Sequence, residues 1–201
     1  YLEKQTLKSS SIIIVDDKSS ENYQTIIQKF PNLQIEYIRN ENNLGAINNI
    51  FKTILYADNS PFKISLHEDD LLHPQYLEKA AKILEDKPDV AFVISKAKWF
   101  KNESELKKIL SRTWDLLDVS YVNKRDFIRS ILDGKHLMLG SVVYRNSIIT
   151  EKPDLAKYDV LCDRPFLLSL IKENMMVAII EDPGIVAQDH SEKDSRAEKV
   201  T

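Results

Sequence analysis

The sequence predicts an α/β domain in which helices flank a mixed, mostly parallel sheet. Short apolar runs rich in β-branched residues alternate along the chain with segments whose apolar residues recur at helical spacing. The length of 201 residues, 43% apolar and 29% charged, suits one globular domain with a buried core. We expect a single domain over residues 1–191, followed by a charged tail over residues 192–201 that frays.

The expected strands are short, mainly apolar runs, some rich in β-branched residues and some alternating apolar with polar residues. They cover residues 11–15, 33–38, 62–66, 89–95, 136–144 and 175–180. The first run, Ser-Ile-Ile-Ile-Val, is expected to be a buried strand. These segments supply the sheet.

The expected helices carry an apolar stripe at helical spacing. They cover residues 43–57, 74–86, 124–133 and 163–173. Pro74 and Pro165 suit the first turns of two of them, and Gly134 suits the C-terminal cap of another. The polar segment 99–122 contains short stretches with helical spacing, but its pattern does not place a helix or strand with definite bounds.

Composition narrows the class of protein. The net charge of −3 and the pI near 5.9 argue against a nucleic-acid partner. The single cysteine, Cys162, excludes an internal disulfide and fits a reducing compartment. The longest apolar run, residues 175–180, is far shorter than a transmembrane helix. We therefore expect a cytoplasmic protein without a transmembrane segment.

Three adjacent carboxylates, Glu68, Asp69 and Asp70, follow the expected strand 62–66. Neighbouring carboxylates repel one another, so a buried strand rarely ends on them unless a cation or hydrogen-bond donors lie nearby. The carboxyl edge of an open α/β sheet is also where such folds bind ligands. The alternative interpretation is a charged turn before the helix that starts near Pro74.

Acidic residues also follow the first strand, as Asp16 and Asp17, with Ser19 close behind. These side chains either cap the next helix or accept hydrogen bonds from a base N–H or a ribose hydroxyl. Two strands that end in acids at one sheet edge favour a ligand site over two unrelated turns.

Two further segments allow a structural and a functional interpretation. Residues 39–49 include Arg39, Asn43 and Gly45 among many amide side chains, and they form either a polar loop that caps a helix or a set of donors for a phosphate or sugar. Asp163 precedes Pro165 and an apolar run, so it is either a helix cap or a general base held in a fixed geometry.

The order of these segments resembles the nucleotide-sugar-binding core of the family-2 glycosyltransferases, which have the GT-A fold. Residues 5–20 resemble "Q-T … E-I-I-I-V-D-D-G-S", with Lys18 at the usual glycine, and residues 39–45 resemble "R-x-x-x-N-x-G". Residues 67–74 are similar to the metal motif "D-x-D-D-x-x-x-P". Residues 162–166 are similar to "E/G-D-x-x-F", which carries the catalytic base. Residues 188–191 faintly resemble "y-R-x-H-x-x-S" without its arginine, so the roles of His190 and Glu68 stay open.

The resemblance implies an inverting transfer of a sugar from a nucleoside diphosphate sugar, most often a UDP-sugar, to an acceptor hydroxyl. It implies a divalent cation, Mg²⁺ or Mn²⁺, on Asp70 and Asp69, and Asp163 as the general base. Asp16 or Asp17 would contact the uracil, Arg39 the base or the diphosphate, and Asp69 the sugar or ribose. The donor-binding residues it implies are Asp16, Asp17, Ser19, Arg39, Asn43, Gly45 and Asp69.

One departure concerns the sheet. The family usually begins with a strand reading roughly "V-S-I-I-I-P-x-Y-N", which this sequence lacks. In the GT-A sheet that strand lies between the strand ending at Asp16 and the strand ending at Glu68. Its absence would leave backbone groups of both neighbours without partners, so we expect the natural protein to have further residues upstream.

The acceptor implied by the family is a glycan, a lipid-linked molecule or another hydroxyl compound, as in cell-surface polysaccharide biosynthesis. Contact with the inner face of the membrane stays open. Trp99, Trp114 and Tyr121 either stack on a sugar or belong to the core. Two other functions are weighed: an inactive GT-A-like binding module, and a phosphorelay receiver in which Asp16 and Asp17 would meet Lys96.

Overall fold

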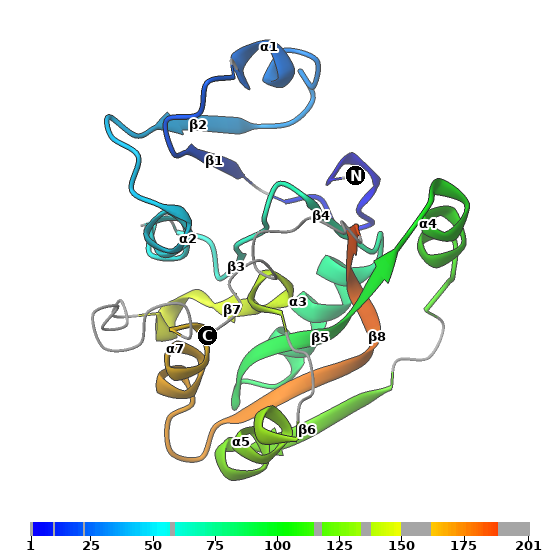
Figure 1. Ribbon diagram of the computed structural model, residues 1–201. Helices are drawn as coiled ribbons and strands as arrows, with labels where there is room; N and C mark the ends of the chain where they lie inside the picture. Colours follow the sequence, from blue (N-terminus) through cyan, green and yellow to red (C-terminus); the bar gives the residue numbers. More distant parts are fainter. Residues whose placement is uncertain are drawn as a thin grey trace, which may run out of the picture.

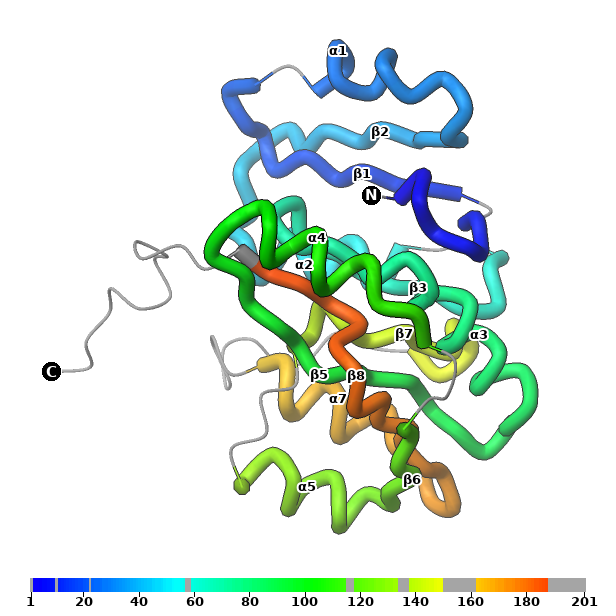
Figure 2. Tube along the Cα trace, turned by 90° about the vertical axis from the view of Figure 1, so that its right-hand side faces the viewer, coloured from blue at the N-terminus to red at the C-terminus, as the bar shows by residue number. Residues whose placement is uncertain are grey.

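The protein forms two β-sheets surrounded by helices. The computed structural model describes residues 2–9, 11–21, 23–56, 59–114, 118–133, 138–149 and 162–188. Strands β1 (Ile12–Asp16) and β2 (Ile35–Arg39) pair in parallel as a two-stranded sheet. Together with the short helix α1 (Tyr23–Ile27), they form a separate layer beside the second sheet (Figures 1 and 2).

The second sheet has six strands in the order β3-β7-β5-β8-β4, with β6 also paired to β8. Their bounds are β3 (Phe62–Ile64), β4 (Asp70–Leu72), β5 (Val90–Phe100), β6 (Val119–Asn123), β7 (Val143–Arg145) and β8 (Met176–Gln188). The longest ladder is the parallel pairing of β5 with β8, while β3, β4, β6 and β7 join by antiparallel pairings. The predicted α/β class is confirmed, with a mixed sheet.

Helices cover both faces of this sheet. The remaining helices are α2 (Ala46–Ile54), α3 (Tyr76–Asp86), α4 (Glu103–Leu110), α5 (Lys124–Leu132) and α7 (Asp163–Leu170), with 3₁₀ turns η1 (Leu2–Lys4), η2 (Leu139–Ser141) and η3 (Asn146–Ile148). Because side chains alternate along a strand, β5 feeds two cores: Phe92 packs with α2, α5 and α7, and Val93 packs with α3. α4 covers a smaller cluster near the end of β5.

Most of the predicted elements are present, but they begin or end at other residues than predicted. Within the described part of the strand expected over residues 136–144, residues 139–141 form η2 instead, and β7 starts only at Val143. The hydroxyl of Ser141 lies 2.8 Å from the Met138 carbonyl, which closes this tight turn. The strand expected over 62–66 ends at Ile64. The next residue, Ser65, places its hydroxyl 2.8 Å from the Thr53 hydroxyl of α2. Conversely, β5 and β8 run well past the predicted ends.

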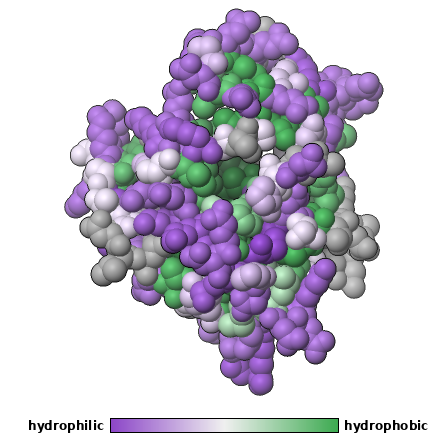
Figure 3. Space-filling model, turned by 180° about the vertical axis from the view of Figure 1, so that it is seen from behind, coloured by the Kyte–Doolittle hydropathy of each residue, from purple (hydrophilic) through white to green (hydrophobic). Residues whose placement is uncertain are grey.

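The first strand is less buried than predicted. Ile12 to Val15 are all only half-buried, because β1 pairs with β2 on one edge and, within the described residues, with no strand on the other. Figure 3 shows a hollow between the upper layer and the rest of the molecule, with hydrophobic residues at its base. The break between β1 and β3 falls where the sequence predicted a missing central strand. The expected cap at residue 134 and the tail lie outside the described residues.

The close contact at Gly184 of β8 provides a test of this packing. A Cβ atom there would lie 2.4 Å from Tyr76 Cδ2 and 2.5 Å from Ser95 Oγ. We expect Gly184→Ala to lower the free energy of unfolding by about 1–3 kcal/mol, the usual cost of overpacking a core. Urea unfolding measures it, with Lys82→Ala in an exposed ion pair as control. Equal stabilities of both variants would contradict the packing of α3 on β8.

Candidate active site

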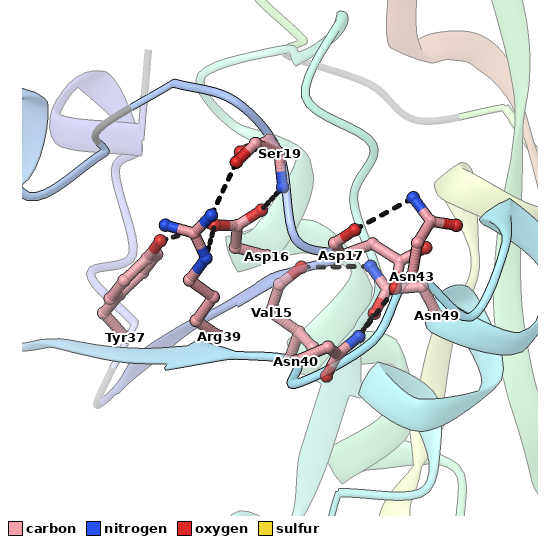
Figure 4. A network of polar contacts seen from close by, with 9 residues as sticks. All are labelled: Val15, Asp16, Asp17, Ser19, Tyr37, Arg39, Asn40, Asn43 and Asn49. Carbon is pink, nitrogen blue, oxygen red and sulfur yellow. Dashed lines mark hydrogen bonds and ion pairs between the residues drawn. The ribbon is translucent and has the colours of Figure 1, made fainter.

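The loops after β1 and β2 form one hydrogen-bonded unit at the edge of the small sheet (Figure 4). Parallel pairing of β1 with β2 sets Asp16 beside Arg39, so residues 16–20 and 39–45 leave the sheet together. Lys18, at the position where the family pattern has glycine, has a φ of 63°. The chain therefore keeps at Lys18 the left-handed turn that glycine adopts most easily.

Asp16 is buried and is satisfied by donors from the loop after β1 and from β2. Its Oδ1 accepts the backbone N–H of Ser19 at 2.8 Å, and its Oδ2 accepts the Tyr37 hydroxyl at 2.5 Å. Arg39 Nε lies 3.6 Å from the same Oδ2. Burial raises the pKa of the Asp16 carboxyl, but the hydrogen bonds from Tyr37 and Ser19 and the charge of Arg39 together lower it below the ordinary value.

Asp17 joins the first loop to the amide-rich loop. Its Oδ1 accepts the Leu44 N–H at 2.7 Å and the Asn40 side-chain amide at 2.8 Å, and its carbonyl accepts the Asn43 amide at 3.0 Å. The Leu44 hydrogen bond is the largest cause of the lowered pKa of Asp17. Gly45 then begins α2 with a φ of 79°. The amides therefore organise the loop, but none of them caps α2, whose N-cap Gly45 has no side-chain capping hydrogen bond.

A second acidic centre lies at the start of β4. Ligand atoms of His67, Asp69 and Asp70 all lie within 4.8 Å of one another, a spacing that would allow one metal ion to bind. Asp70 Oδ2 is 3.7 Å from His67 Nδ1, and the Asp70 side chain is only 1% exposed. His67 was not among the predicted site residues, although it occupies the first acidic position of the metal motif.

The sheet fixes the position of Asp70. The pairing of Asp70 with Ala187 and of Leu72 with Ile185 holds β4 on β8. Gly140 of η2 packs closely over it, because a Cβ there would be 3.2 Å from Asp70 Oδ2. The sequence predicted Asp70 in a loop after a strand; it is instead the first residue of a separate short strand.

The phenol of Tyr23 interacts electrostatically with residues of both acidic segments. Burial raises the pKa of its phenol most, and the charges of Glu68, Glu21 and Asp16 raise it further. Glu68, in the loop after β3, and Asp16, at the end of β1, therefore both act electrostatically on this one phenol. The convergence of the two acidic motifs at one ligand site stays a prediction.

Asp163 is the first residue of α7 rather than its cap, and its Oδ1 accepts the Arg164 N–H at 2.8 Å. Its charge contributes, after burial, to the raised pKa of the Tyr144 phenol on β7. Tyr144 lies four residues beyond Gly140, which contacts Asp70. The segment from η2 to β7 therefore passes from the His67–Asp70 cluster to the neighbourhood of Asp163. His190 lies outside the described residues.

The three aromatic candidates divide between core and surface. Trp114 is buried and stacks on His73 with centroids 4.1 Å apart, so it belongs to the core. Tyr121 is on β6, under the Lys87 ammonium. Trp99 is 39% exposed and pairs with Ala187, the residue that Asp70 pairs with from the other side. Trp99 and Asp70 thus project from the same face of the sheet.

The geometry disagrees with the receiver interpretation. Lys96 Nζ forms an ion pair with Glu181 Oε2 at 2.5 Å in the large sheet. Asp16 and Asp17 are engaged by donors of the small sheet instead. The acidic pair and Lys96 therefore do not build one phosphoacceptor pocket.

Comparison with known proteins identifies the class. The family model described as Glycosyl transferase family 2 matches residues 2–144. An uncharacterized glycosyltransferase from Haemophilus influenzae is 30% identical over 99 residues, which are 48% of this chain and 32% of that protein. The chain belongs to glycosyl transferase family 2, as the sequence motifs predicted.

Solved structures share the fold. S. aureus TarS 1–349 in complex with UDP-GlcNAc aligns with a TM-score of 0.68 and 17% identity over 100% of this chain and 56% of that one. The mannosyltransferase PcManGT from Pyrobaculum calidifontis, in complex with GDP-Man and Mn²⁺, aligns with a TM-score of 0.55 and 15% identity over 96% of this chain and 51% of that one. The predicted GT-A class is confirmed. The chain spans about a third of the curated relative and about half of these structures.

No helix in the described part of the chain is both long and apolar enough to cross a membrane. This agrees with the short apolar runs of the sequence.

The burial of Asp16 predicts a pH-dependent contribution of Tyr37. A carboxyl with a lowered pKa in the folded state stabilises the protein above its ordinary value of 3.8, and this stabilisation is lost as the pH falls through the folded-state pKa. We expect Tyr37→Phe to cost about 1 kcal/mol near pH 7 and progressively less below pH 3.8. Urea unfolding across this range measures it.

The matched control is Tyr56→Phe, because the Tyr56 hydroxyl donates to the exposed Glu36 carboxylate at 2.7 Å. It should cost less at neutral pH. A cost for Tyr37→Phe that does not change with pH would contradict the role assigned to the Asp16 carboxylate.

Proposed function

We propose that this domain transfers a sugar from a nucleoside diphosphate sugar to an acceptor hydroxyl with inversion at the anomeric carbon, and that the donor is a UDP-sugar. The clustering of ligand atoms from His67, Asp69 and Asp70, together with the joined loops after β1 and β2, carries the proposal. Family membership and the nucleotide-bound neighbours support a nucleotide-sugar donor, and the UDP-GlcNAc complex of TarS favours uridine.

Asp70 and Asp69 would hold a divalent cation, Mg²⁺ or Mn²⁺. The residues fit such a group, because Asp70 is a buried carboxylate beside an exposed one and an imidazole, and buried charges require compensation. The cation, when bound, offsets the charge that develops on the leaving diphosphate. Asp69, which is exposed, would also reach the ribose or the sugar.

The nucleotide would rest on the two joined loops. We assign Asp16 or Asp17 to the uracil, Arg39 to the base or diphosphate, and Ser19, Asn43 and Gly45 to the supporting loop. The Arg39 side chain, half exposed, donates to the Ser19 carbonyl at 2.7 Å. Because these groups already hold one another, the loops would be organised before the donor binds, which reduces the entropic cost of binding.

Asp163 would act as the general base. In the proposed step, the acceptor oxygen forms a bond to the anomeric carbon as the bond from that carbon to the diphosphate oxygen breaks. The hydroxyl proton passes to the Asp163 carboxylate, and the nucleoside diphosphate leaves with the bonding electrons. Attack from the face opposite the leaving group requires no covalent intermediate.

The acceptor is proposed to be a glycan, a lipid-linked molecule or another hydroxyl compound, as in cell-surface polysaccharide synthesis. We also propose that the protein acts in the cytoplasm, in a single catalytic domain over residues 1–191, with the inner face of the membrane as one place where it meets its acceptor. The exposed Trp99, on the same sheet face as Asp70, marks one side of the region open to an acceptor.

The other candidate is a binding module of the same fold without catalysis. The break in the sheet between β1 and β3 favours this inactive module, because the loops proposed to bind the nucleotide lie at the edge of the small sheet beside the break. Turnover of a UDP-sugar distinguishes the two: an inactive module binds UDP without releasing it from the sugar nucleotide.

Thermal unfolding with UDP and Mn²⁺ tests the donor site. With both present at about 100 times the Kd, we expect the Tm to rise by roughly 5–10 °C, because binding to the folded state alone stabilises it. UDP without a divalent cation should give a much smaller rise, and Asp70→Asn should remove the cation-dependent part. The absence of a shift with UDP or any other nucleotide would refute the proposal for this chain.

Asp163→Asn tests the general base. The amide keeps the shape of the side chain but cannot take the proton, so we expect kcat to fall by at least about 10²-fold. The affinity for UDP should change little. Turnover of the UDP-sugar that stabilises the protein measures kcat, and the exposed neighbouring variant Arg164→Gln is the control. Loss of transfer together with loss of UDP binding would contradict the assignment.

A further inference from the structure

His67 occupies a position in the metal motif where the resemblance leads one to expect a carboxylate. It directly precedes the Glu68-Asp69-Asp70 run, and its imidazole belongs to the cluster whose ligand atoms all lie within 4.8 Å of one another. Asp70 N–H donates to the His67 carbonyl at 3.3 Å. This turn brings side chains three residues apart to the same side of the chain.

The separation between the two side chains is informative. His67 Nδ1 lies 3.7 Å from Asp70 Oδ2, which is too long for a hydrogen bond. Two atoms that each coordinate one cation at about 2.0–2.2 Å lie roughly 3–4 Å apart, depending on the angle at the metal. The observed distance therefore suits two ligands of a shared ion better than a direct contact.

The protein does not hold the imidazole through its other nitrogen. His67 Nε2 is buried and has no hydrogen-bond partner among the residues that the structure describes. The side chain as a whole is 35% exposed, so the cluster is open on one side. Gly140 leaves room beside Asp70 that a larger residue would fill, since a Cβ there would approach Asp70 Oδ2 to 3.2 Å.

We propose that His67 is a direct ligand of the divalent cation, together with Asp70 and Asp69, and that it makes the site prefer Mn²⁺ over Mg²⁺. The proposal rests on the metal-dependent function proposed above. Mg²⁺ is a hard ion that favours oxygen ligands, whereas imidazole nitrogen suits transition metals. A histidine in place of a carboxylate also lowers the negative charge of the site, which weakens Mg²⁺ binding further.

Pulsed EPR of bound Mn²⁺ tests the ligand directly and does not depend on activity. In the full chain with UDP and Mn²⁺, we expect electron spin echo modulation from a directly bound ¹⁴N nucleus. The modulation should change to the ¹⁵N pattern when the protein is labelled with ¹⁵N-histidine. His67→Asp should remove the nitrogen modulation while keeping Mn²⁺ bound through three carboxylates.

Calorimetric titration with Mn²⁺ and Mg²⁺ in the presence of UDP tests the preference. Changes to groups that merely support metal ligands already shift affinity by about 10- to 100-fold. We therefore expect the ratio of Mg²⁺ to Mn²⁺ dissociation constants to fall by at least about tenfold in His67→Asp. Glu68→Gln, a neighbouring change outside the cluster, should keep both the nitrogen modulation and the ratio. His67→Asn serves as a second variant if His67→Asp does not fold.

The outcomes separate the two proposals. Mn²⁺ that binds with UDP but shows no histidine nitrogen would overturn the role of His67 and leave the transferase proposal standing. A metal preference that is the same in wild type and His67→Asp would likewise overturn it. If neither UDP nor Mn²⁺ binds to the folded protein, the proposed function itself fails, and the role of His67 fails with it.

Discussion

The pairing of β8 with its neighbours is the constraint on which the position of the His67–Asp70 cluster depends. β8 is 13 residues long, and its parallel ladder with β5 forms the centre of the large sheet. Its other edge pairs first with β6 and then with β4. β4 has only three residues, so its position is set by β8 rather than by its own propensity. Asp70 is fixed at the sheet edge because its pairing partner, Ala187, is itself fixed by the pairing of β8 with β5.

The loops after β1 and β2, which we propose to bind the nucleotide, depend on a different support. β1 and β2 form a sheet of their own, and two strands are marginal without further packing. Side-chain hydrogen bonds supply much of the additional order, because Asn49 donates to the Val15 carbonyl at 3.0 Å and thereby ties α2 to β1. The two halves of the proposed site thus rest on elements of unequal stability. A ligand that contacts both halves would add cohesion across the break between β1 and β3.

The sequence predicted the fold class well, because apolar periodicity and the motifs that follow the strands are local patterns. Periodicity located β1, α2, α3 and β5, and the order of motifs indicated the family. It did not locate β4, because three residues that begin with an aspartate carry no strand signal. Nor did it single out His67, whose importance depends on a 3.7 Å approach to Asp70 that only the turn produces. The half-burial of β1 likewise depends on strand pairing, which local sequence does not encode.

The two acidic centres differ in the groups that surround their buried carboxylates. Asp16 and Asp70 are both buried, yet Asp16 receives a backbone N–H, a phenol and the charge of an arginine from its own chain. Its charge is compensated internally, so its main effect is to fix the loop around it. Asp70 instead has as its ion-pair partner an imidazole at 3.7 Å, which is a cation only when protonated. A buried carboxylate beside an imidazole and an exposed carboxylate is a set of ligands that an external cation could bind. The same residue type therefore serves as a structural anchor after β1 and as the centre of the proposed chemistry at β4.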